Sequence, residues 1–135
     1  MRTTPFFMFQ GGASGWLDLA VAAVPGSRVT SISRYGPDGP GAEGTVAMAE
    51  IEIGGLLVRC NDSVITHDFT FTPSTSLFVD LDSEAQHASA HELLAADGKV
   101  LMPPDDYGFS QHFSWVEDRF GVSWQLNVPW QPDVT

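Results

Sequence analysis

The chain has 135 residues, of which 43% are hydrophobic and 11% aromatic, a composition typical of one globular domain rather than a disordered chain. Its net charge is −11, with Lys99 as the single lysine, so it lacks the basic surface to which nucleic acids and anionic membranes bind. No apolar run has the length of a signal peptide or a membrane span, and the single cysteine, Cys60, cannot form an intrachain disulfide. These features predict an acidic cytoplasmic protein with neither nucleic acid nor membrane among its partners.

The first half of the chain alternates between strand and helix patterns. A short apolar run at residues 5–10 predicts a strand, and residues 14–24 carry apolar side chains at i, i+3, i+4 and i+7, which predicts a helix. The apolar stripe of that helix consists of Leu17, Ala20, Val21 and Val24. Further strands are expected at residues 28–35, 45–53 and 56–60, the last two joined by a two-glycine hairpin turn.

The second half repeats this order. A strand is expected at residues 76–80, and Ser83 followed by Gln86 forms a capping-box pattern that starts a helix ending at Ala96. The remaining strands are expected at residues 99–102, 112–117 and 122–127. Both halves therefore have a strand, a helix and three more strands, offset by about 70 residues, which predicts an internal duplication. Each strand–helix–strand step pairs strands in parallel, so we expect a mixed sheet with helices on one face and the other face free for a cavity.

Three stretches carry a family resemblance: residues 27–46, residues 76–80 and residues 100–127, the last of which contains WVEDRFGVSWQ. They resemble the PhnB-like branch, also called 3-demethylubiquinone-9 3-methyltransferase domains, of the vicinal oxygen chelate or glyoxalase–bleomycin resistance superfamily. The resemblance implies an α+β fold within a single domain spanning residues 1–135. Two βαβββ modules, at about residues 5–61 and 74–129, would form a mixed sheet curled around a concave cavity. It also implies a homodimer.

The resemblance further suggests where a metal ion would bind. Metal-dependent members place His or Glu early in the first strand, late in the fourth, at the start of the fifth and in the eighth. This chain has Pro5, Phe6 and Phe7, then Arg59 and Asn61, then Ser74, Thr75 and Ser76, and then Gln125 at these positions. A divalent ion prefers imidazole or carboxylate ligands, so we predict no metal. We also predict no cofactor, because the strand after the first helix ends without the acidic residue that binds a ribose.

The predicted substrate-binding residues of the second module lie on its last two strands. Polar and apolar side chains alternate in residues 122–127, so the apolar set should pack under the helices and leave Gln125 facing the cavity. An amide there could donate and accept hydrogen bonds to a neutral polar substrate. Phe113 and Trp115 share one face of the neighbouring strand and should form an apolar wall. His112, where an aromatic loop enters that strand, is expected near the cavity mouth and is the candidate general acid or base.

The first module supplies Arg59 and Glu50 as the charged groups expected to reach into the cavity, and Phe7 of its first strand is a further predicted binding residue. An arginine among aromatic walls favours an acidic or carbonyl-bearing ligand, although Arg59 could instead pair with a carboxylate across a dimer. Cys60 is expected to be a small buried hydrophobic residue rather than a nucleophile.

The other histidines have a second interpretation. His87 and His91 are four residues apart on the predicted helix, which is the spacing of a metal-binding pair. No third ligand is evident, so a packed pair of imidazoles is the favoured interpretation. His67 is expected at the surface.

Three functions remain open from the sequence. The first is a metal-free module that binds a small oxygenated molecule in its cavity. The alternative is an enzyme of the glyoxalase or dioxygenase type, in which His112, Glu50 or Arg59 performs acid–base or electrostatic work on a small substrate. The third is a dimerisation scaffold with a filled cavity. No catalytic residue can be assigned among them.

Overall fold

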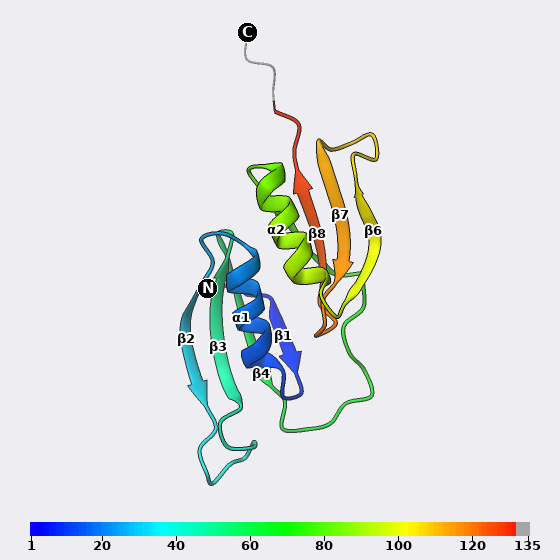
Figure 1. The fold of residues 1–135 in the computed structure, drawn as a ribbon. Helices are drawn as coiled ribbons and strands as arrows, with labels where there is room; N and C mark the ends of the chain where they lie inside the picture. Colours follow the sequence, from blue (N-terminus) through cyan, green and yellow to red (C-terminus); the bar gives the residue numbers. More distant parts are fainter. Residues whose placement is uncertain (132–135) are drawn as a thin grey trace. The chain divides into compact units, whose positions relative to one another are not determined.

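The computed structural model describes residues 1–131, which form two compact units, one from Met1 to Asp68 and one from Phe69 onward. Each unit contains four strands and one helix (Figure 1). Neither of the helices within the described residues is long and apolar enough to cross a membrane.

The first unit is a four-stranded mixed sheet with one helix against one face. Its elements are β1 (Phe6–Phe9), α1 (Ala13–Ala23), β2 (Arg28–Arg34), β3 (Val46–Ile53) and β4 (Leu56–Asp62). The strand order is β1-β4-β3-β2, in which β1 and β4 are parallel and the other pairs are antiparallel. Figure 1 shows α1 lying along this sheet.

The second unit repeats the same topology. Its elements are β5 (Ser76–Asp80), α2 (Glu84–Ala95), β6 (Lys99–Asp105), β7 (His112–Glu117) and β8 (Ser123–Val128), in the strand order β5-β8-β7-β6. Again the first and last strands of the unit pair in parallel, and the other pairs are antiparallel. The α+β fold of two βαβββ modules is therefore confirmed. β6 continues past the predicted end at Met102 because it is an edge strand, where Pro103 and Pro104 are tolerated.

The core of the first unit forms between α1 and the sheet. Trp16 and Ala20 are fully buried, and the rings of Phe7 and Phe9 lie 5.4 and 5.2 Å from the ring of Trp16. Val21, predicted to belong to the buried stripe, is 39% exposed. The stripe runs through Trp16 instead, because Trp16 and Ala20 also have helical i, i+4 spacing.

A buried carboxylate holds the start of α1. Gly12 occupies the N-cap position and offers no side chain, so the helix has no local cap. Asp62, at the end of β4, is 3% exposed, and its Oδ1 accepts hydrogen bonds from the amides of Gly11 (2.8 Å) and Ala13 (3.0 Å). Its Oδ2 accepts a third bond from the amide of Val46 (2.9 Å). One side chain therefore joins α1, β3 and β4.

In the second unit, the start of α2 is capped by neighbouring residues. Ser83 Oγ accepts a hydrogen bond from the amide of Gln86 (3.1 Å), and Gln86 Oε1 accepts one from the amide of Asp82 (2.9 Å). This is the predicted capping box. Beneath α2, the side chains of Trp124 and Leu126 are fully buried, as the alternation in β8 predicted.

Candidate functional site

Strand register defines two sheet faces in each unit. We call the face that does not carry the unit's helix its open face. In the second unit, Trp115 lies directly opposite Gln125, and Phe113 lies opposite Asn127, while Gln125 also lies beside Phe78 of β5. Opposed residues share a face, so these side chains all lie on one face of the sheet. The face is the open one, because the alternating residue Ser114 contacts α2.

Aromatic rings surround one end of this open face. The ring of Phe113 lies 6.1 Å from that of Phe78, 5.9 Å from Tyr107 and 5.0 Å from Phe109. Phe78 and Phe109 are 54% and 57% exposed, whereas Phe113 beneath them is 2% exposed. Phe78 was not among the predicted site residues. Its alternation with the buried Leu77 in β5 was the signal that could have identified it.

The polar neighbours of Gln125 already have hydrogen-bond partners. Ser123 Oγ accepts a bond from Trp115 Nε1 (2.7 Å), and Asn127 Nδ2 donates to Asp80 Oδ1 (2.8 Å). Gln125 is half-buried, and within residues 1–131 its side-chain amide has no hydrogen-bond partner. The open face of the second unit therefore presents one unused amide between fixed aromatic and polar groups.

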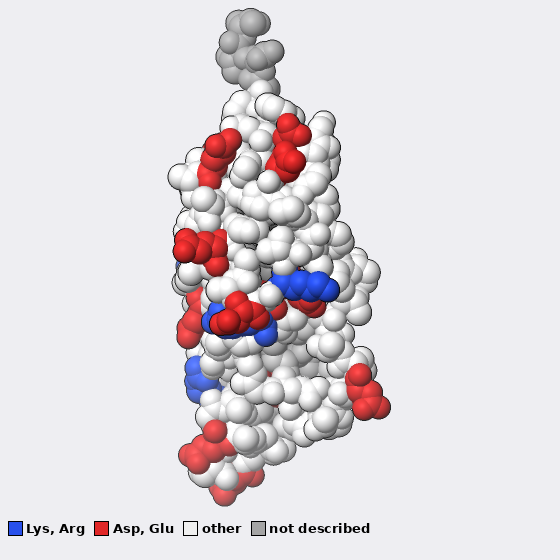
Figure 2. All heavy atoms as spheres, turned by 45° about the vertical axis from the view of Figure 1, so that its right-hand side comes forward, with Lys and Arg blue, Asp and Glu red and all other residues white. Residues whose placement is uncertain are grey.

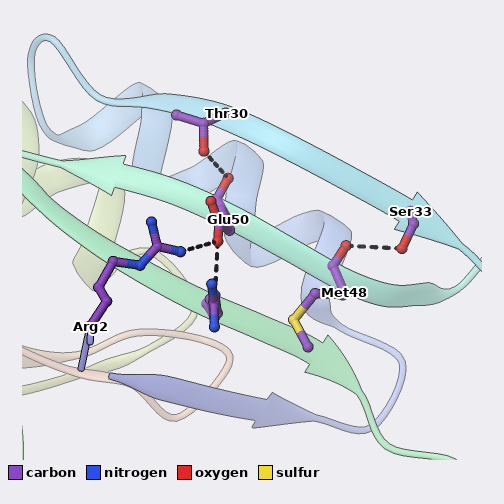
Figure 3. A network of polar contacts seen from close by, with 6 residues as sticks. Arg2, Thr30, Ser33, Met48 and Glu50 are labelled. Atoms are coloured by element: carbon purple, nitrogen blue, oxygen red, sulfur yellow. Dashed lines mark hydrogen bonds and ion pairs between the residues drawn. The ribbon is translucent and has the colours of Figure 1, made fainter. Parts of the chain in front are cut away.

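The open face of the first unit carries charge instead. Arg59 lies opposite Glu50, and its Nε donates to Glu50 Oε1 (2.8 Å) within the same chain. Arg2 Nη2 donates to the same oxygen (3.0 Å), and Figure 3 shows Arg2 and Glu50 directed toward one another. The hydrogen bond from Arg59, aided by the charge of Arg2, holds the pKa of Glu50 below its usual value despite partial desolvation. Glu50 is therefore a fixed anion and a poor proton donor at neutral pH.

Two predicted site residues lie on helix-covered faces. Phe7 contacts Trp16, whereas its neighbour Phe6 is 47% exposed and lies beside Arg59 in register. His112 shares the face of Ser114, and its ring lies 4.5 Å from the ring of His87 in α2. Thus Gln125, Trp115 and Phe113 come together in one unit and Arg59 and Glu50 in the other, while Phe7 and His112 join neither group.

His87, His91, His112 and Ser114 form a group that we call the histidine cluster. Ser114 Oγ lies 3.0 Å from His87 Nε2 and 2.9 Å from His91 Nδ1, and the two imidazole rings are stacked 5.9 Å apart. Burial, followed by the neighbouring His112 and His91, lowers the pKa of His87 from 6.5 to about 4. Burial and then His112 also lower the pKa of His91. This matches the packed imidazole pair that we favoured over a metal-binding pair.

The residues do not fit the metal ion found in metal-dependent relatives. The described residues contain no group of three or more His, Cys, Asp or Glu side chains that could hold a metal ion. The open faces offer the guanidinium of Arg59 and the amide of Gln125 at the positions where imidazoles or carboxylates would be needed. Cys60 is fully buried, and burial, with a smaller effect of Asp62, raises the pKa of its thiol to about 12.

A separate cleft of about 260 Å³ lies at the start of α1, lined in part by Gln10, Gly11, Thr45 and Asp62. An anionic cofactor group would meet helix amides there. The amides of Gly11 and Ala13 are already bound to the carboxylate of Asp62, which would also repel an anion. Figure 2 shows that acidic side chains are spread over the visible surface and that basic ones are few.

The comparisons with known proteins agree with this architecture. A family model described as 3-demethylubiquinone-9 3-methyltransferase matches residues 1–127. The PhnB protein from Bacillus cereus is 41% identical, with a TM-score of 0.90, and the match covers 95% of this chain and 99% of that one. Protein PA1353 from Pseudomonas aeruginosa is 21% identical, with a TM-score of 0.80 and coverage of 96% and 98%.

A more distant likeness is one of fold alone. The fosfomycin resistance protein FosX from Mesorhizobium loti is 11% identical, with a TM-score of 0.61 and coverage of 96% and 92%. No curated protein matches the chain. From its match over residues 1–127 and its 41% identity to the Bacillus cereus protein, the chain belongs to the 3-demethylubiquinone-9 3-methyltransferase family, the PhnB-like branch of the glyoxalase/bleomycin resistance fold.

Proposed function

We propose that this protein binds a small oxygenated molecule on the open face of its second unit and needs no metal ion to do so. The observation that carries the proposal is the unused, half-buried amide of Gln125 beside Trp115 and Phe78. This amide can both donate and accept hydrogen bonds, so a ligand carbonyl or hydroxyl group could replace the water that otherwise binds it.

The surrounding side chains suit the rest of such a ligand. Phe78 and Phe109 expose apolar ring surface, which a bound molecule would remove from water. The open face of the first unit is a separate candidate surface, where Arg59 uses its Nε for Glu50 and its terminal nitrogens make no hydrogen bond within residues 1–131. These donors suit a carboxylate or carbonyl group.

The same geometry favours binding over turnover by acid–base chemistry. Glu50 is held as an anion by two arginines, and His112 lies against α2 rather than on the open face. Methyl transfer, which the family description names, gains no support, because Asp62 occupies the amides at the start of α1. Catalysis therefore stays the alternative.

We also propose that the chain acts as a homodimer. The proposal is supported by Trp130, which follows β8 and is 61% exposed. An exposed tryptophan of this kind is typical of a contact surface. Size exclusion with light scattering should give twice the chain mass, and a monomer mass would contradict it.

Ligand-observed NMR with a panel of small aromatic acids, amides and ketones tests the binding proposal. Compounds that bind the wild type should lose about tenfold in affinity to Gln125→Leu, the cost of one lost hydrogen-bond partner. Gln10→Leu, which changes an exposed glutamine outside the open face, should bind as the wild type does. Equal affinities for both variants would contradict the role of Gln125.

A further inference from the structure

We infer that the histidine cluster makes the seating of α2 on its sheet acid-sensitive, and that acid thereby weakens ligand binding on the open face of the second unit. The effect of acid on ligand binding rests on the proposed function, whereas the acid sensitivity of α2 does not. His87 and His91 both contact Ser114 beneath the helix, and the ring of His112 lies against that of His87.

The shared hydroxyl cannot satisfy two protonated imidazoles at once. Ser114 is fully buried and has one proton to donate and two lone pairs. With neutral rings, Ser114 can donate to one of His87 Nε2 and His91 Nδ1 and accept from the other. If both rings are protonated, both must donate to Ser114, and its own proton is then left without either of these acceptors. Two cations would also be stacked 5.9 Å apart.

Within residues 1–131, no acidic side chain forms an ion pair with a histidine of the cluster. On α2, Glu84 and Glu92 are exposed, and neither forms an ion pair with a cluster histidine. β7 contributes Glu117, which lies on the open face, and β8 contributes no ionisable side chain. The side chain of His87 is fully buried, and its Nδ1 has no well-formed hydrogen bond. The backbone of Leu126 favours the protonated ring, but this effect is smaller than that of burial.

The direction of the pH effect follows from these surroundings. His87 and His91 both have a lowered pKa in the folded chain, so the unfolded chain binds more protons as the pH falls below about 6.5. The packing of α2 is therefore stable at neutral pH. It loses stability from about pH 6.5 toward pH 4, where His87 itself protonates.

β7 links this cluster to the open face. His112, Ser114 and Val116 point to α2, and the alternating residues Phe113 and Trp115 point to the other side. Loosening of α2 removes the support on one side of the strand that carries the apolar wall on the other. Ligand affinity should fall with the stability of α2.

The acid sensitivity of α2 can be tested by hydrogen exchange of the ligand-free full chain at pH 7.5 and 5.5, with rates corrected for the intrinsic exchange rate. α1 is the internal control, because it contacts no histidine cluster and is held by Trp16 and Asp62. We expect the protection of α2 to fall about tenfold, as one pKa unit implies, with α1 changing less than about twofold. Equal changes in both helices would overturn the inference.

A variant comparison gives a second, independent test. His87→Gln/His91→Gln removes both histidines whose pKa is lowered and should lose much of the acid-dependent drop in melting temperature, whereas His67→Gln, in the connector of the first unit, should keep it in full. Retention of the full drop by the double variant would also overturn the inference. Both experiments use no ligand, so their failure leaves the proposed function standing. Failure of the Gln125 test leaves the acid sensitivity standing.

Discussion

The two units have the same topology and hold their helices by different chemistry. α1 begins without a local cap and is fastened by Asp62, which lies 49 residues after Ala13 in the chain. α2 begins with its own capping box at Ser83 and rests on the histidine cluster. A duplicated scaffold can therefore keep its strand order while the interactions that secure each helix change completely.

Their open faces differ as much as their helix starts. The first carries the ion pairs of Glu50 with Arg59 and Arg2, whereas the second carries aromatic rings around the amide of Gln125. The ion pairs thus lie on the open face of one module and the aromatic cluster on that of the other. Substitutions in matched places of the two units can test how far these differences extend.

The largest effect is expected at the start of α1. Asp62→Ala leaves the buried amides of Ala13 and Val46 and the part-buried amide of Gly11 unpaired, and it should lower the free energy of unfolding by about 3 kcal/mol, since each orphaned donor costs on the order of 1 kcal/mol. Urea unfolding measures the change. Asp38→Ala, at an exposed carboxylate, is the control and should have little effect. A loss below about 1 kcal/mol would mean that water or a neighbouring group replaces the carboxylate.

A smaller effect is expected on the open face of the second unit. Trp115→Ala removes a half-buried indole and its hydrogen bond to Ser123, which should cost about 2 kcal/mol. Arg59→Ala, on the first unit, should leave the urea midpoint nearly unchanged, because the ion pair is partly solvated. The reverse order of effects would show that charge, rather than aromatic packing, stabilises the open faces.

The start of α2 should be less sensitive than that of α1. Ser83→Ala removes one local cap and should cost about 1 kcal/mol in urea unfolding. Ser89→Ala, at an exposed position within α2, is the matched control and should be neutral or slightly stabilising. If Ser83→Ala cost as much as Asp62→Ala, the distinction between the two helix starts would not hold.

The elements could be predicted because their signals are local. The capping box at Ser83 and the alternation around Gln125 need only neighbouring residues, and the structure confirms both. The role of Asp62 could not be predicted, because its three partners come from two distant segments. Sequence pattern carries no signal for contacts of this range.

The direction in which a single side chain points was harder to predict from the sequence than the type of element that carries it. β1 reads Phe-Phe-Met-Phe, and four apolar residues in a row do not reveal which of Phe6 and Phe7 faces the helix. For β7, alternation alone could have separated His112 from Phe113, since neighbouring residues point to opposite faces. Because both residues follow the aromatic loop before β7, His112 and Phe113 were predicted to belong to one site.

We propose that the open face of the second unit binds its ligand without a metal ion. Elemental analysis of the purified, untagged chain, paired with thermal melts in EDTA and in excess Mg²⁺, Mn²⁺, Ni²⁺ and Zn²⁺, tests it most directly. A metal that binds the folded chain must raise the melting temperature by mass action. We predict no stoichiometric metal and the same melting temperature in EDTA and in each metal. Stoichiometric metal together with a lower melting temperature in EDTA would contradict the account.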